Sequence, residues 1–274
     1  MFYRSRKQIA IVSIVILCLI IVGVIFYFSS RPQPNCFDGI RNQGEQEIDC
    51  GGPCISCEVL TLKDIQIDLT QAIKSREGVY DLVAKVKNPN PNFGVPYFKY
   101  RFDLKDKNGQ IVISKEGASF ILPNSSRYII ENNIVSSEEV ASAKLEIEKI
   151  DKNSWQQLRD YQSPDLYIND KNLRIDNASA FLAEATGVVE NRTSFDLDKV
   201  YVDIVIFNQA GKAIAVSNTE IRTLTAGENR HFSAKWFYQF LENIKPSLDM
   251  QVETNLFLDD NYMRKHGNPD ERGL

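Results

Sequence analysis

The sequence predicts a mainly β fold, with an N-terminal transmembrane helix, a small disulfide-rich module and two β-sandwiches in tandem. Three observations lead to this prediction. An apolar run near the N-terminus is long enough to cross a bilayer, and four cysteines follow it within one short stretch. Most of the remaining chain alternates apolar and polar residues with the period of β-strands.

The first element is the apolar run Ile9–Phe28, which follows a short basic segment, residues 1–8. About twenty helical residues span the hydrocarbon core of a bilayer, so this run predicts one membrane-spanning helix. Basic residues precede the run and only Arg31 follows it closely, which places the N-terminus in the cytoplasm and the rest of the chain outside it. The run lacks a small-residue cleavage site, which favours a signal anchor over a cleaved leader.

The second element, residues 36–57, contains Cys36, Cys50, Cys54 and Cys57. Outside the cytoplasm thiols pair, so we expect two disulfides, for which three connectivities are open. One CxxC pair without histidine falls short of a zinc knuckle, which would become the alternative if the segment were cytosolic. A redox role would need a thioredoxin-like context, which the surrounding sequence lacks.

Four oxygen-bearing residues of the same stretch could converge on a calcium ion, namely Asp38, Asn42, Glu45 and Asp49. The alternative is that these side chains form turns beside the glycines of the stretch and are otherwise solvated. Apart from this possible calcium ion, the sequence predicts no cofactor.

The stretch from Cys36 to Cys57 matches the pattern C-x-D-G-x-x-N-x-x-E-x-x-x-D-C-G-G-x-C-x-x-C at every defined position. Through this pattern the stretch resembles a short extracellular module of secreted and surface proteins. The resemblance implies a location at the cell surface and no reaction.

The alternation of apolar and polar residues over 58–151 predicts the first sandwich. From Phe98 to Leu104 aromatic and aliphatic residues alternate with charged ones, as in a half-buried strand, and Asn108-Gly109 predicts the hairpin that follows. The same plan restarts in the predicted second sandwich, residues 173–258, where Glu190-Asn191 corresponds to Lys87-Asn88. The chain is therefore expected to contain a duplicated domain.

Two segments are expected to lie outside the sandwiches. Residues 152–172 are polar and predict a linker. Residues 259–274 are charged and lack periodicity, so they predict a flexible tail.

The two units also resemble known families. Val86-Lys87-Asn88-Pro89-Asn90, followed by Phe102-x-Leu104-x-Asp106, is similar to the group-two late embryogenesis abundant (water-stress) fold and to the bacterial FxLYD-type domain. The second unit resembles FxLYD through Ala185 to Asn191 and Leu224-Thr225-Ala226-Gly227-Glu228. The resemblance implies immunoglobulin- or fibronectin-like sandwiches on the outer side of a membrane, with no catalytic residues to transfer.

A search for catalytic residues yields none. The two histidines, His231 and His266, fall in a predicted strand and in the predicted tail, and no nucleophile elbow, phosphate-binding loop or zinc-protease motif occurs. A charge of −4 without a basic run beyond the N-terminus argues against nucleic acid. Phe93 and Tyr97 form a candidate partner-binding loop, unless they plug the end of the sandwich.

The sequence therefore predicts a single-pass, extracytoplasmic, non-catalytic protein that acts as an envelope scaffold or a protein-binding module. We expect a protein partner in the envelope and no small-molecule substrate. A stress-related stabilising protein is one alternative, and an envelope enzyme subunit is another. A deep polar pocket with perturbed carboxylates between the two sandwiches would favour the enzyme subunit.

Overall fold

A computed structural model describes residues 15–27, 35–158, 161–175, 182–238 and 246–266 of the chain. The chain divides into two compact units, Met1–Leu60 and Thr61–Leu274. The first contains a helix over residues 15–27 and the cysteine segment, which ends in the short helix α2 (Cys57–Leu60). No helix within the described residues is both long and apolar enough to span a membrane. The predicted span Ile9–Phe28 extends at both ends into residues outside this description and stays a prediction.

The second unit begins with six strands that form the first sandwich. They are β1 (Gln66–Arg76), β2 (Val79–Lys87), β3 (Phe93–Lys105), β4 (Ile111–Ile121), β5 (Ser126–Val135) and β6 (Ser142–Ile147). They pair into two antiparallel sheets with the orders β1-β2-β5 and β4-β3-β6. The predicted hairpin at Asn108-Gly109 joins β3 to β4, and Gly109 adopts a positive φ of 81° there.

Six further strands form the second sandwich. They are β8 (Leu166–Ile175), β9 (Ala183–Asn191), β10 (Leu197–Phe207), β11 (Ala213–Leu224), β12 (Asn229–Trp236) and β13 (Ser247–Glu253). Their sheets have the orders β12-β9-β8 and β11-β10-β13. Both sets of six strands therefore pair in the same order, as a duplicated domain requires.

The duplication extends to one buried asparagine at the end of an equivalent strand in each sandwich. Asn88 and Asn191 are both fully buried. The side-chain amide of each donates to main-chain carbonyls across the sandwich, those of Phe93 and Leu122 for Asn88, and those of Phe195 and Leu224 for Asn191. Each amide thus supplies a donor to two main-chain carbonyls, of which those of Leu122 and Phe195 also accept a hydroxyl group.

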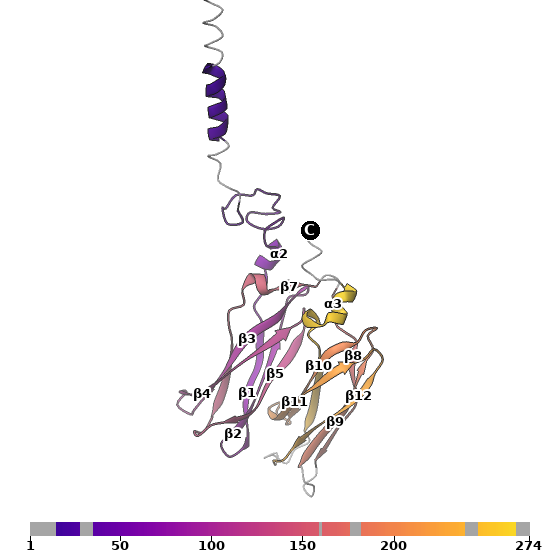
Figure 1. Ribbon diagram of the computed structural model, residues 1–274. Coiled ribbons are helices and arrows are strands. Elements are labelled where there is room, and N and C mark those ends of the chain that lie inside the picture. Colours follow the sequence, from indigo (N-terminus) through magenta and orange to yellow (C-terminus); the bar gives the residue numbers. More distant parts are fainter. Residues whose placement is uncertain (1–14, 28–34, 159–160, 176–181, 239–245, 267–274) are drawn as a thin grey trace, which may run out of the picture. The chain divides into compact units, whose positions relative to one another are not determined.

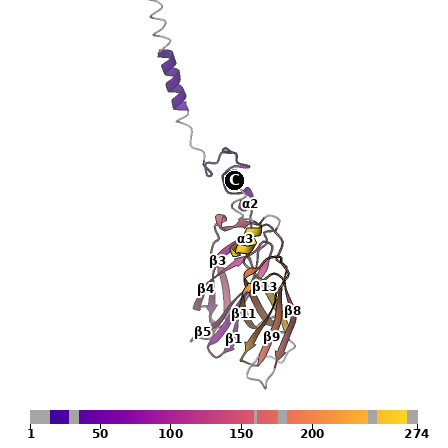
Figure 2. The same cartoon turned by 45° about the vertical axis from the view of Figure 1, so that its right-hand side comes forward.

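The two sandwiches pack against each other through one sheet of each (Figure 1). The sheet β1-β2-β5 faces the sheet β11-β10-β13, and the same layers are visible in the turned view of Figure 2. A buried apolar cluster joins the two sheets and consists of Ile73, Val83, Tyr128, Ile130, Val205, Ala213 and Val216. Because apolar surface of both sandwiches is removed from water here, the two are expected to behave as one folding unit.

Two predicted boundaries need correction. The strand β8 begins at Leu166, inside the predicted linker 152–172, and β7 (Gln156–Gln157) of that linker pairs with β3. The predicted flexible tail 259–274 contains the helix α3 (Asp260–His266), which follows the 3-10 helix η2 (Leu256–Leu258). Its Tyr262 is buried in an apolar cluster, and this contact orders a segment whose sequence has no periodicity. The last residues, 267–274, lie outside the described part of the chain.

Candidate functional site

The cysteine segment carries two disulfides, Cys36–Cys54 and Cys50–Cys57, which selects one of the three possible connectivities. Within the described residues, two groups of cysteine and carboxylate side chains lie close enough together to hold a metal ion. The sulfurs of both groups belong to these disulfides, so they offer no thiolate to zinc.

The four predicted calcium ligands lie together in this segment, but their carboxylates bind main-chain and amide nitrogens. Asp38 accepts from the main chain of Ile40 and from the Asn42 side chain, each at 2.9 Å. Glu45 is buried and accepts the main-chain N–H groups of Asn42 and Asp49, each at 3.2 Å. These bonds are the ones expected of turn formers.

Asp49 completes the set by accepting the main-chain N–H of Gly39 with both carboxylate oxygens, at 3.0 and 3.1 Å. One oxygen of the segment, Oδ1 of Asn42, is buried without a hydrogen-bond partner among the described residues. Turn formation alone explains the positions of these carboxylates. Calcium binding therefore stays a prediction.

The candidate partner-binding pair lies at the start of β3 and not in a loop. Phe93 is buried, as expected if it plugs the sandwich, whereas Tyr97 is 58% exposed. Only Tyr97 of the two is therefore available to a partner.

Sequence reasoning missed a buried charge cluster at the junction of the sandwiches. Arg127 of β5 is 7% exposed at its side chain and lies between Asp203 of β10 and Glu253 of β13. Its Nη2 is 3.9 Å from Asp203 and its Nε is 3.5 Å from Glu253. The guanidinium also lies over the ring of Phe120, 3.9 Å from the centroid, which is a cation–π arrangement.

This cluster has two carboxylates for one guanidinium. Burial raises the pKa of Asp203 to about 6, although Arg127 acts in the opposite direction. Burial also raises the pKa of Glu253 to about 7, with Arg127 opposing and Asp203 adding to the shift. Because like charges and low dielectric both disfavour the ionised forms, the cluster is expected to hold a proton in mildly acidic solution.

A cavity of about 470 Å³ opens beside this cluster, and Glu253 is part of its wall. The first sandwich supplies the loops before β3 and β5, and the second supplies β13 and the start of β8. Tyr161, Ser163 and Pro164 of the predicted linker complete the wall. Asp203 does not line the cavity, so one carboxylate of the pair faces it. We call this cavity the junction pocket.

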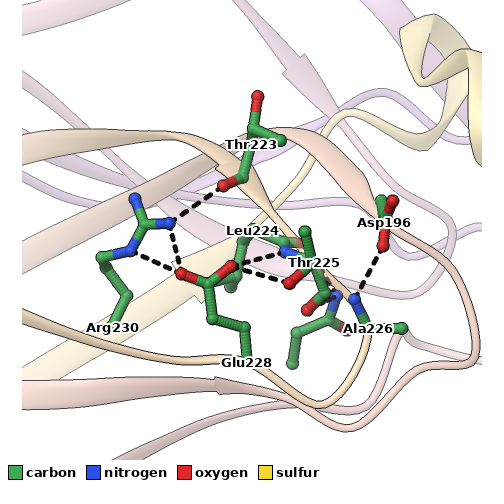
Figure 3. A network of polar contacts seen from close by, with 8 residues as sticks. Asp196, Thr223, Leu224, Thr225, Ala226, Glu228 and Arg230 are labelled. Carbon is green, nitrogen blue, oxygen red and sulfur yellow. Dashed lines mark hydrogen bonds and ion pairs between the residues drawn. The ribbon is translucent and has the colours of Figure 1, made fainter.

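The stretch from Leu224 to Glu228 has a structural role. Glu228 accepts from the main chain and hydroxyl of Thr225 at 2.8 and 2.9 Å and also pairs with Arg230 (Figure 3). These bonds hold the pKa of Glu228 below its ordinary value, the main-chain bond being the largest cause. The turn so fixed presents the carbonyls of Leu224 and Thr225 to the buried Asn191.

The buried cluster had a signal in the sequence. Asp203 interrupts the apolar run from Val200 to Phe207, and Arg127 directly precedes Tyr128-Ile129-Ile130. A single charge inside a run without alternation indicates a strand buried on both faces, with a charged partner elsewhere. The partner could not be named, because Glu253 is far away in the chain.

No family model matches the chain, and no curated protein matches it. Solved structures that resemble it include a calcium-binding mutant of Bacteroides uniformis beta-glucuronidase 2, with 14% identity, a TM-score of 0.28, and coverage of 70% of this chain and 27% of that one. A beta-glucuronidase from glycoside hydrolase family 2 has 10% identity, a TM-score of 0.29, and coverage of 82% and 27%. Red sea bream transglutaminase has 10% identity, a TM-score of 0.21, and coverage of 70% and 29%. The chain thus spans about a quarter of their length, and the likenesses are too distant to assign a function.

Proposed function

We propose that this chain is a single-pass membrane protein whose two sandwiches form a rigid, non-catalytic binding module outside the cytoplasm. The observation that carries the proposal is the pair of disulfides in residues 36–57, directly after a long apolar run with basic residues on its N-terminal side. The resemblance of both units to FxLYD-type domains is consistent with this location.

The packing of the sandwiches supports a binding role. Their junction buries apolar and charged side chains from both units, so the loops at the ends of the sheets keep a fixed relation to one another. The junction pocket is built from both sandwiches and would be lost if they separated.

Counting the thiols of the full chain tests the location. The sequence has five cysteines, and four are paired in the structure, which leaves Cys18 free. After denaturation without reductant, a maleimide–polyethylene glycol reagent should therefore shift one thiol, and after reduction it should shift all five. The Cys18→Ser variant is the control, since it should show no shift without reductant.

Protease added to intact cells should then remove the part of the chain that follows the apolar run. Five reactive thiols without reductant, or a chain that resists the protease while a surface control is digested, would refute the proposed location.

One observation favours an enzyme as the second candidate. The junction pocket lies beside two carboxylates of raised pKa, as an acid–base site would. We favour binding because only Glu253 lines the pocket, and a pair of catalytic carboxylates would both have to reach the substrate. Turnover of glycosides or esters by the full chain, abolished in Glu253→Gln, would instead support the enzyme.

A further inference from the structure

The junction pocket has the size and the lining of a ligand site. Its volume of about 470 Å³ lies within the range of small-molecule pockets, roughly 300 to 1,000 Å³. Pro91, Pro123, Pro164 and Leu166 supply apolar walls, while Ser125, Ser126 and Asn124 supply hydroxyl and amide groups. Such a wall suits a ligand that has an apolar stem and one polar end.

Glu253 determines which polar end fits. Among the described residues its one ionic partner is Arg127, and Arg127 is shared with Asp203. When both carboxylates are ionised, the cluster has one negative charge too many, and that charge lies in a side chain that is 13% exposed and forms part of the pocket wall. A buried unpaired charge is costly, so the cluster must either bind a proton or acquire a second cation.

We propose that the junction pocket binds an organic cation, an ammonium or guanidinium group on an apolar stem, which in a protein partner is a lysine or arginine side chain. The cation pairs with Glu253 and replaces the proton that the cluster otherwise holds. This inference deepens the binding role proposed above, and relies on it only for the presentation of the cation by a partner protein.

The chemistry of the pocket favours a cation over a neutral polyol. Several polar groups of the wall already form hydrogen bonds within the protein. Gln251 donates to the main-chain carbonyl of Ser126 and accepts from the main-chain N–H of Tyr128. The hydroxyl of Ser125 donates to the carbonyl of Leu122. The hydroxyl oxygen of Ser125 keeps a lone pair, so it can accept from an ammonium. Tyr161 adds an aromatic ring to the wall, and burial raises its pKa to about 12, so it stays neutral.

Binding is expected to depend on pH in a defined direction. The titratable and charged groups around Glu253 are Arg127 from β5, Asp203 and the cross-strand partner Tyr201 from β10, and Tyr161 from the segment before β8. Glu253 must lose its proton to pair with the cation, and burial places its pKa at about 7. The affinity should therefore rise about tenfold between pH 6 and pH 8, with release of a proton on binding.

The experiment uses the full chain in nanodiscs and saturation-transfer NMR. The probe is Nα-acetyl-lysine-N-methylamide, and its neutral counterpart is the norleucine derivative, which lacks only the ammonium group. We expect the lysine derivative to bind at least about tenfold more tightly at pH 8, since a charge-assisted hydrogen bond contributes about 1.5–3 kcal/mol. Glu253→Gln should remove this preference.

Two further variants make the result specific. Glu146→Gln removes the same charge from the surface of β6, where Glu146 pairs with Lys144 and with Arg101 of β3, and should leave binding unchanged. Ser163→Phe fills the wall of the pocket and should abolish binding without changing a charge. Equal binding of the lysine and norleucine derivatives, no binding of either, or an unchanged preference in Glu253→Gln would each overturn the inference. The thiol and protease tests above do not involve the pocket, so failure of the inference and failure of the proposed location are distinguishable.

Discussion

Replacing Glu253 by glutamine should change how the stability of the protein depends on pH. Burial raises the pKa of Glu253 from its ordinary value of 4.5 to about 7. The folded protein then holds the proton more tightly than the unfolded chain does. The stabilisation from this group is fully present below about pH 4.5 and is lost as the pH rises through about 7.

The magnitude follows from the two pKa values. A difference between 4.5 and about 7 corresponds to roughly 3 kcal/mol, of which about 2 to 3 kcal/mol is lost between pH 5 and pH 8. Glu253→Gln keeps the shape of the side chain and removes the titration. The variant should therefore lose about 2 to 3 kcal/mol less free energy of unfolding than the wild type over this interval.

The assay is equilibrium unfolding in guanidinium chloride at pH 5 and pH 8, followed by tryptophan fluorescence. The chain has two tryptophans, both buried: Trp155 follows the 3-10 helix η1 (Lys152–Ser154) next to β7, and Trp236 lies in the core of the second sandwich. Glu146→Gln is the control for net charge, because its carboxylate lies on the surface. Parallel losses in the wild type and in Glu253→Gln would refute the reasoning, because they would mean that Glu253 is solvated in the folded protein.

Three further substitutions test the fold, each by the free energy of unfolding. Asn191→Ala removes one donor from each of three carbonyls and the acceptor of the Thr193 N–H, and should cost about 2 to 4 kcal/mol, whereas a loss below about 1 kcal/mol would show that water replaces the side chain. Tyr128→Phe removes the 2.7 Å hydrogen bond from the hydroxyl to Asp249 across the junction and should cost about 1 to 2 kcal/mol; an unchanged midpoint would contradict this. Val205→Asp places a charge in the fully buried junction and should cost more than about 3 kcal/mol. A much smaller loss would mean that the two sandwiches are only in loose contact.

Several local elements of this protein could be predicted from its amino-acid sequence alone. Alternation from Phe98 to Leu104 sets one face of β3 inward, and Asn108-Gly109 marks its hairpin, because both features depend on backbone geometry within a few residues. The correspondence of Lys87-Asn88 with Glu190-Asn191 likewise identified positions that the structure shows to be equivalent. Four cysteines indicated two disulfides, although not their pairing.

Which outer faces of the sheets meet could not be predicted from the sequence and became clear only from the packing of the two sandwiches. On the outward face of β3, Lys99 and Lys105 are at least partly exposed and Asp103 pairs within its own sandwich, whereas the equivalent face of β10 carries Asp203 and Val205 and is buried against the first sandwich. Period-two alternation indicates that one face of a strand is buried. It does not indicate whether the opposite face meets solvent or another sheet. The pairing of Arg127 with Asp203 and Glu253, and the junction pocket beside them, depend on chain segments that meet only when the two sandwiches pack, and so does the burial that raises the two pKa values.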